Sequence, residues 1–148
     1  MSEVEAFLES TMPRLTAAET ALGNGDAGPR MALWSHQDPV TLFGAAATKR
    51  GWAEIAPLFE WLASEFSSCA SYDIEILAAG ASGDLAYTVA LEHVTASLGA
   101  SEPTSFSLRV TTIFRREEGE WKPVHRHGDP YDASAADAIA AHRERAPR

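Results

Sequence analysis

The stretch that decides the fold runs from residue 108 to residue 128 and reads LRVTTIFRREEGEWKPVHRHG. Apolar and polar residues alternate in its first half, a turn is centred on Gly119, and a second run opens with Trp121. Alternation on both sides of a glycine turn predicts two long antiparallel strands. The second strand carries His125 and His127. Because alternate side chains of a strand share a face, both imidazoles are expected on one side of the sheet.

Hydrophobic periodicity predicts helices in the first half of the chain and strands in the second. Spacing near 3.6 indicates a helix, and a period of two indicates a strand. The predicted helices cover about 3–22, 28–34 and 51–67, with a short one at 134–143 in the tail 133–148; the predicted strands cover about 40–43, 70–79, 84–97, 104–116 and 120–128, and residues 45–51 form a loop. This order indicates an α+β class, with N-terminal helices packed on a curved antiparallel sheet. The length of 148 residues fits a single domain, 1–148.

Composition excludes several classes of function. The net charge is −9, so binding to nucleic acid or to an anionic membrane surface is not expected. No apolar stretch approaches the roughly 18 residues that span a bilayer, and no signal peptide is expected because the N-terminal residues lack a basic region followed by an apolar run. The single cysteine, Cys69, cannot form an intramolecular disulfide and fits a reducing cytoplasm, where we expect the protein to act. No cofactor and no metal are predicted.

The strand predicted at 84–97 is apolar on both faces. One face carries Tyr87 and Val89, and the other carries Thr88 and Ala90. Helices that cover only one side of a sheet leave the other side in need of a second layer. Another copy of the chain is the simplest such layer, so we predict a homodimer through the convex face of the sheet.

Two motifs resemble a known family. Residues 119–127 read GEWKPVHRH, and residues 33–44 read LWSHQDPVTLFG, followed by Gly51 and Trp52. With the order of elements, these motifs resemble SnoaL-like proteins of the nuclear-transport-factor-2-like (ketosteroid-isomerase-like) superfamily. The last strands also resemble the association (hub) domain of calcium/calmodulin-dependent kinases. The resemblance implies a cone-shaped, cystatin-like fold that encloses a ligand pocket.

Polar and aromatic side chains that point into such a pocket are the candidate site. A neutral imidazole can exchange protons near neutral pH. The candidate catalytic residues are His125, His127 and His93. The candidate ligand-binding residues are Trp34, His36, Trp52, Tyr87, Thr112, Phe114 and Asp129. A structural role for the histidines, hydrogen-bonded beneath the helices, stays open. Arg109 is expected on the dimer face, paired with a carboxylate such as Glu92 or Glu75.

The chain departs from its catalytic relatives at the positions that carry their chemistry. Ketosteroid isomerases have an aspartate base at the end of the first short strand, whereas residues 40–44 contain no carboxylate. They also use a tyrosine late in the first helix, and residues 16–19 contain none. The hub domain resembles proteins that bind small carboxylates through arginines pointing into the pocket. The matching positions here look like Val89 and Thr112. The resemblance therefore supports neither that proton transfer nor an arginine clamp.

Two functional hypotheses follow. The first is a domain that binds a small apolar or aromatic molecule in an apolar pocket lined by aromatic and histidine side chains. The alternative is a cofactor-independent isomerase, cyclase or lyase that acts on an apolar carbonyl compound. An enzyme needs a histidine within about 3.2 Å of a carboxylate or of a second histidine inside a closed pocket. Histidines that face solvent or bond only backbone groups favour the binding hypothesis.

Overall fold

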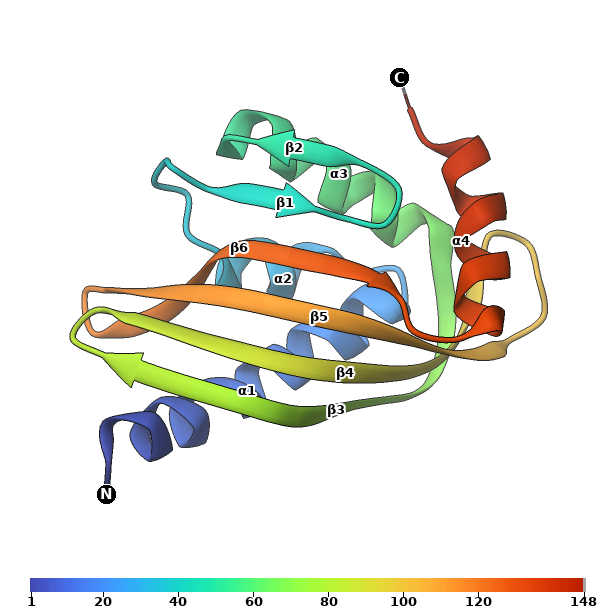
Figure 1. Ribbon diagram of the computed structural model, residues 1–148. Helices are drawn as coiled ribbons and strands as arrows, with labels where there is room; N and C mark the ends of the chain where they lie inside the picture. Colours follow the sequence, from blue (N-terminus) through green and yellow to red (C-terminus); the bar gives the residue numbers. More distant parts are fainter. Residues whose placement is uncertain (148) are drawn as a thin grey trace.

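The computed structural model describes residues 1–147 as four helices and one six-stranded sheet (Figure 1). The elements are α1 (Glu3–Gly23), α2 (Gly28–Leu33), β1 (Thr41–Phe43), β2 (Thr48–Arg50), α3 (Trp52–Glu65), β3 (Phe66–Ser82), β4 (Leu85–Leu98), β5 (Thr104–Glu117), β6 (Glu120–Pro130) and α4 (Ala133–Arg145). The strand order is β2-β1-β6-β5-β4-β3. Helices on a curved sheet confirm the predicted α+β class. Residue 148, the end of the predicted tail, lies outside the described part of the chain.

The sheet differs from the prediction at its β1 edge. β1 pairs in parallel with β6, from Thr41 opposite His125 to Phe43 opposite His127, so the sheet is mixed rather than wholly antiparallel. The predicted loop at 45–51 contains β2, which pairs antiparallel with β1. β1 confirms the strand predicted at 40–43, whereas β2 is only three residues long, which is too short for periodicity to reveal it in the sequence.

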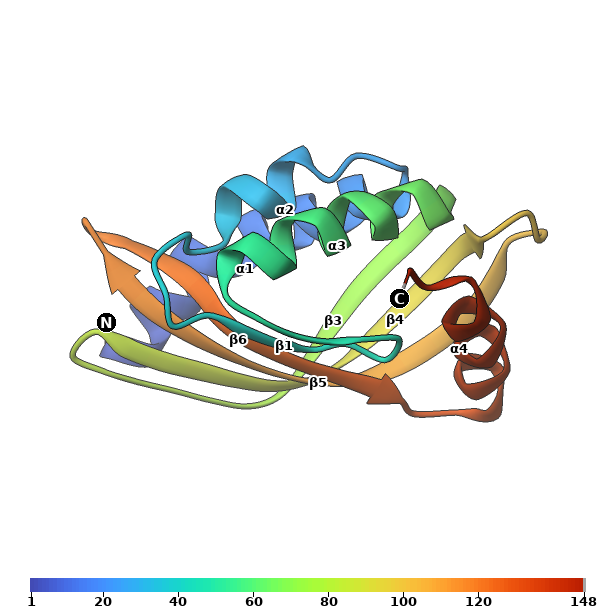
Figure 2. The same ribbon diagram turned by 90° about the horizontal axis from the view of Figure 1, so that it is seen from above.

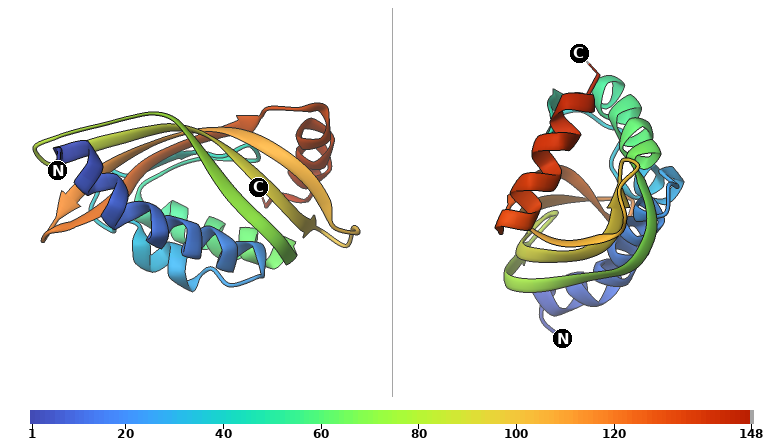
Figure 3. Two further views of the ribbon diagram at one scale, coloured as in Figure 1. Left: turned by 90° about the horizontal axis from the view of Figure 1, so that it is seen from below. Right: turned by 90° about the vertical axis from the view of Figure 1, so that its right-hand side faces the viewer.

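The sheet is bent and wraps around the helices (Figure 2). α1, α2 and α3 lie on its concave side, and α4 lies at one end (Figure 3). β-Bulges favour such bending because the extra residue twists and bends its strand. One irregularity interrupts the β3–β4 pairing between Ile76 and Ala78, and another interrupts the β5–β6 pairing between Ile113 and Phe114. The result is a cone with the helices inside the curve of the sheet.

The bulge in β6 decides which way the side chains of that strand point. Phe114 lies opposite Pro123, and Ile113 lies opposite His125, so Val124 is the extra residue. The buried positions of β6 are odd-numbered before Val124 and even-numbered after it. A register shift of one residue turns every later side chain to the other face of a sheet. The side chain of His125 therefore lies on the convex face.

Aromatic rings fill the cone at the end away from α4 and beneath α2 and α3. Phe7 of α1 packs edge-on against Phe114 and Trp121, with centroid distances of 4.9 and 5.2 Å. Trp34 and Phe59 form a second edge-on pair at 5.1 Å. All five rings are buried. Edge-to-face pairs of this kind add to the free energy gained from burial. The end of the cone beside α4 is filled less completely.

Candidate functional site

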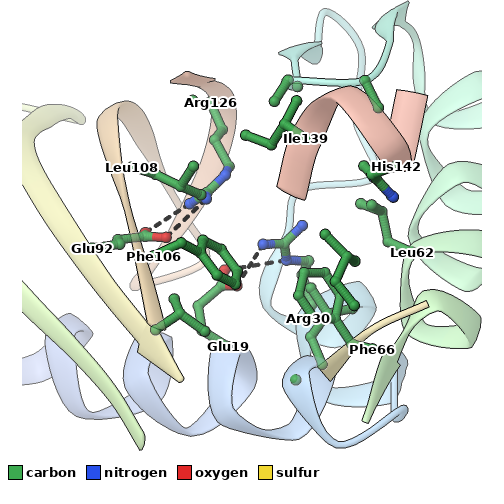
Figure 4. A pocket seen from close by; sticks show the side chains of 18 of the residues that line it. Glu19, Arg30, Leu62, Phe66, Glu92, Phe106, Leu108, Arg126, Ile139 and His142 are labelled. Atoms are coloured by element: carbon green, nitrogen blue, oxygen red, sulfur yellow. Dashed lines mark hydrogen bonds and ion pairs between the residues drawn. The ribbon is translucent and has the colours of Figure 1, made fainter. Parts of the chain in front are cut away.

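A cavity of about 110 Å³ lies between the concave face of the sheet and the helices (Figure 4). Most of its wall is apolar, and the side chains near α4 and the strand ends include Leu62, Phe66, Val94, Leu98, Phe106 and Leu108. Six polar side chains also line it: Glu19, Arg30, Tyr72, Glu92, Arg126 and His142. Charged groups are rare in an apolar wall unless they are paired. The pairing of these six therefore determines what the cavity can bind.

The first buried ion pair joins α2 to α1. The Nε and Nη2 atoms of Arg30 donate to the two carboxylate oxygens of Glu19 at 3.1 and 2.5 Å. Both residues are buried, with exposed fractions of 3% and 7%. The guanidinium also lies over the Phe59 ring, 4.9 Å from its centroid, in cation–π geometry. This pair holds the Arg30 guanidinium in place at the wall of the cavity.

The second buried ion pair joins β6 to β4. Both Nη atoms of Arg126 donate to the Glu92 carboxylate, each at 2.8 Å. Burial alone would raise the pKa of Glu92, but the charge and hydrogen bonds of Arg126 hold that pKa below its ordinary value. The same pairing raises the pKa of Arg126 despite its burial. Both groups are therefore ionised at neutral pH, and neither is available to exchange protons with a ligand.

Tyr72 of β3 places its hydroxyl beside this second pair. Burial raises the pKa of Tyr72 well above its ordinary value, and the nearby charges of Glu92 and Glu19 raise it further. The hydroxyl oxygen is buried, yet no residue of the described chain forms a hydrogen bond with it. Buried polar groups without a partner are rare in folded proteins. Tyr72 thus remains a neutral hydroxyl close to the Glu92 carboxylate, without a hydrogen bond of good geometry to it.

The helix α4 closes the cavity through a small polar cluster. Glu65, at the end of α3, accepts hydrogen bonds from Arg145 Nε at 2.7 Å and from His142 Nδ1 at 3.1 Å. The His142 ring stacks on Trp61 with a centroid distance of 4.6 Å. Burial lowers the pKa of His142, and Glu65 offsets this only in part. His142 is therefore neutral at pH 7, and because a carboxylate only accepts, its proton is on Nδ1.

The structure places the three predicted catalytic histidines outside this cavity, on the convex face of the sheet. His125 Nδ1 lies 2.7 Å from the Thr41 hydroxyl, and His127 Nε2 lies 4.0 Å from Asp129. His93 contacts the Ser107 hydroxyl at 2.7 Å and the Glu75 carboxylate at 3.1 Å, both on the convex face. The expectation that these imidazoles point into the pocket is wrong. The bulge at Val124 turns the first two outward, and strict alternation along β4 turns His93 outward.

The predicted ligand-binding residues also lie away from the cavity. Trp34 is in the core, and Thr112 and Phe114 are buried on the concave face away from the cavity wall. The His36 ring stacks on Trp52 at 4.0 Å beside the start of α3. Tyr87 is 46% exposed on the convex face. Asp129 accepts two hydrogen bonds from Arg109 at 2.6 and 2.9 Å. The structure brings none of these seven side chains to the cavity wall.

Arg109 lies on the convex face, as predicted, but its partner differs from the prediction. The partner is Asp129 on β6, whereas Glu92 points inward and is 2% exposed. Glu75 bonds His93 instead. Glu92 lies opposite Leu108 in the β4–β5 register, on the concave face.

None of the six polar cavity residues was predicted from the sequence to line a pocket, although the sequence contains signals for some of them. Glu19 interrupts the apolar face of α1 between Leu15 and Leu22, and a charge within an apolar helical face signals a buried partner. Arg126 lies between His125 and His127. Those two histidines were predicted to point into the pocket, which placed Arg126 on the opposite face of β6. No sequence signal distinguishes Arg30 or His142 from exposed helix residues.

The family follows from comparison with known proteins. The SnoaL-like domain family matches residues 13–131. The chain belongs to this family. The match ends before α4, so His142 is a feature of this SnoaL-like domain outside the matched segment. No curated protein sequence matches the chain.

Solved structures share the fold of this SnoaL-like domain. An NTF2-like protein from Streptomyces avermitilis, described as a candidate dehydratase, has a TM-score of 0.68 at 18% identity over 87% of this chain and 99% of that one. A protein with a cystatin-like fold from Caulobacter vibrioides has a TM-score of 0.66 at 17% identity over 96% and 99%. A candidate association domain of calcium/calmodulin-dependent protein kinase type II from Thiobacillus denitrificans has a TM-score of 0.63 at 20% identity over 86% and 94%. These similarities confirm the predicted cone-shaped fold.

Two further features bear on the kind of site. Within residues 1–147, no helix combines the length and the apolar character that crossing a bilayer requires. Over the same residues, no group of three or more His, Cys, Asp or Glu side chains is arranged to hold a metal ion.

Replacing one member of the Arg126–Glu92 pair is expected to destabilise the fold, because the remaining charge is buried without a partner. Arg126→Met is predicted to lower the free energy of unfolding by about 3–5 kcal/mol. The double variant Glu92→Leu/Arg126→Met is expected to recover most of this loss, because it removes both charges. Urea denaturation measures both values.

The exposed pair Arg109–Asp129 provides the matched control. Arg109→Met is expected to leave the free energy of unfolding close to that of wild type, because exposed ion pairs contribute little. Equal destabilisation by the Arg126 single variant and the double variant would contradict the prediction.

Proposed function

We propose that this SnoaL-like domain binds a small apolar or aromatic molecule inside the cone. The observation that carries the proposal is a mainly apolar cavity between the sheet and the helices whose polar wall contains two buried ion pairs. Protein interiors are normally packed without voids larger than a water molecule. Buried ion pairs contribute little to stability compared with well-packed apolar residues. The unfilled volume and the buried charges both lower the stability of the fold. The binding of a ligand explains why the chain has them.

The size of the cavity limits the ligand. The volume of about 110 Å³ is somewhat smaller than an apolar cavity of about 150 Å³ that admits benzene. It therefore suits a molecule about one ring wide. Larger ligands, which occupy about 300–1,000 Å³, would require α4 to move. Three residues of α4 are buried, Ala135, Ile139 and His142, and side chains of the helix also form hydrogen bonds with β5, α3 and the loop after β1, which such a movement would break.

A second candidate function is the cofactor-independent isomerase, cyclase or lyase, and one observation favours it. The Nδ1 atom of His142 lies 3.1 Å from the Glu65 carboxylate, and His142 lines the cavity. Within the described residues, Nε2 of His142 forms no hydrogen bond and keeps a lone pair that can accept a proton. This pair meets the geometric requirement for a general base, which the three predicted catalytic histidines do not meet inside the cavity.

We further propose that two copies associate through the convex face. Two rows of side chains cross β4, β5, β6 and β1 there: Tyr87, Ile113, His125 and Thr41 in one, and Val89, Thr111, His127 and Phe43 in the other. The four large apolar members are 37–46% exposed. No helix of the described chain covers this face (Figure 3). The Arg109–Asp129 pair lies at its edge, so the face has the apolar centre and polar rim of an interface.

Narrowing the cavity at Gly128 is expected to weaken binding without disturbing the fold. A Cβ at Gly128 would lie 3.7 Å from Arg126 Nη2 and 3.8 Å from Nε, which are ordinary contacts. Gly128→Val therefore fills part of the cavity, and we expect the affinity for toluene to fall about tenfold or more. Titration followed by two-dimensional NMR measures this affinity. Thr111→Val, on the convex face of the neighbouring strand, is the control and is expected to leave it unchanged. Equal affinities in wild type and Gly128→Val, or no binding to wild type, would refute the proposal.

Proton exchange tests the second candidate function. A general base at His142 Nε2 would take an α-proton from acetophenone, leave the enolate, and allow a solvent deuteron to replace the proton. We expect wild type to catalyse this exchange in D₂O and His142→Gln to slow it about a hundredfold or more. His125→Gln on the convex face is the control and is expected to keep the wild-type rate. NMR of the ketone measures the rate, and a wild-type rate equal to that of buffer supports the binding module alone.

A charge at the centre of the convex face is expected to separate the two copies. Ile113→Glu would bring two carboxylates together across a twofold axis, and like charges in an interface repel. Sedimentation velocity at micromolar concentration is expected to show a wild-type dimer and an Ile113→Glu monomer with the same circular dichroism. Tyr131→Glu, at an exposed residue outside both rows, is expected to remain dimeric. A monomeric wild type would exclude the homodimer.

A further inference from the structure

The hydrogen bonds of the two buried arginines leave one nitrogen of each without an acceptor. Arg30 uses Nε and Nη2 to bind Glu19, and Arg126 uses Nη1 and Nη2 to bind Glu92. A guanidinium carries five N–H donors on three nitrogens. Over residues 1–147, Nη1 of Arg30 and Nε of Arg126 therefore have no hydrogen-bond acceptor. Both arginines line the cavity, and their side chains are 4% and 11% exposed.

Figure 4 shows how these groups lie around the open space. Each guanidinium turns one side to its carboxylate, and the third nitrogen of Arg30 points away from Glu19. Gly128 also lines the cavity, and the nearest atoms that a Cβ there would meet include Arg126 Nε at 3.8 Å. The missing side chain at Gly128 thus keeps space open next to Arg126. The unpaired donors and the space beside them form a place for an acceptor atom.

The balance of charge decides what kind of acceptor fits. Glu19 and Glu92 each neutralise one arginine, so the four side chains carry no net charge. An anionic ligand would add a buried negative charge with no cation left to neutralise it, and such a charge is costly. An uncharged acceptor would satisfy the donors without that cost. The rest of the ligand meets an apolar wall, including the Phe66 and Phe106 rings, whose planes differ by 26°.

We propose that the ligand is an uncharged compound about one ring wide, whose acceptor oxygen binds Nη1 of Arg30 and Nε of Arg126. The inference rests on the proposed binding function and adds the chemical class of the ligand and the donors that recognise it. An aryl or cyclic ketone, aldehyde, ester or amide has this form. A carboxylate does not, although it has the same shape.

Three probes of one shape test the assignment on the wild-type protein. Acetophenone presents a carbonyl oxygen, 2-phenylpropene replaces that oxygen with CH₂, and benzoate presents an anion. A hydrogen bond to a charged donor is expected to make acetophenone bind about tenfold or more tightly than 2-phenylpropene. Benzoate is expected to bind more weakly than acetophenone. NMR titration of backbone amides and of the Arg126 Nε–H signal measures each affinity and its location.

A charge-balanced variant tests the donor directly. Glu19→Gln/Arg30→Gln removes both charges of one pair and is expected to bring the ratio of ketone to hydrocarbon affinity closer to one. The control is Arg109→Gln/Asp129→Asn, which removes an exposed pair on the convex face and is expected to keep the wild-type ratio. If the first variant does not fold, the three-probe comparison on wild type still decides the question.

The possible outcomes separate this inference from the proposed function. Equal affinities for ketone and hydrocarbon would leave the binding function standing and overturn the assigned donors. Tightest binding by benzoate at the cavity residues would overturn the uncharged class. If none of the three probes perturbs the cavity residues, the binding function fails, and this inference fails with it.

Discussion

The single extra residue in β6, Val124, controls the arrangement of the site. Before it, Trp121 and Pro123 face the helices, and without it the alternation would carry His125 and His127 inward as well. The bulge instead turns Arg126 and Gly128 toward the concave face. Because one residue of register exchanges the two faces of a strand, this feature exchanges an imidazole site for a guanidinium site. The cavity chemistry and the composition of the convex face both follow from it.

The two ion pairs then give the cavity its character. Each joins two different elements through bidentate hydrogen bonds, α2 to the neighbouring α1 and β6 to β4, which is distant in sequence. Such geometry fixes the direction of the guanidinium groups, which a lysine in the same place would not do. Each pair sets one guanidinium against one carboxylate and leaves no net charge. The two ion pairs therefore supply no strong acid, no strong base and no unpaired cation that would bind an anion. This favours recognition of a neutral molecule over proton transfer at the two pairs.

The relatives share the cone-shaped fold. The function of each chain depends on the residues inside the cone, which must be examined chain by chain. Solved structures with identities of 17–20% reproduce the fold over most of this chain. One fold of this kind can carry unrelated activities because function resides in the side chains placed on it. Here the helix α4, which lies beyond the matched segment, contributes His142 and closes the cavity. A catalytic role for His142 would depend on this helix and on Glu65 of α3, which lies within the matched segment.

Local patterns in the sequence were enough to predict most elements of the fold. The 3.6-residue spacing in α1 and α3, the period of two from β3 onward, and the turn at Gly119 all depend on local chemistry, and local patterns can be recognised without coordinates. The folded chain is needed to tell which face of each strand meets the cavity. No local pattern encodes the contacts that set the parallel pairing of β1 with β6, the bulge at Val124 or the ion pairs between elements. For that reason the family and the fold could be predicted, whereas Arg30, Arg126 and His142 were found only once the chain was folded.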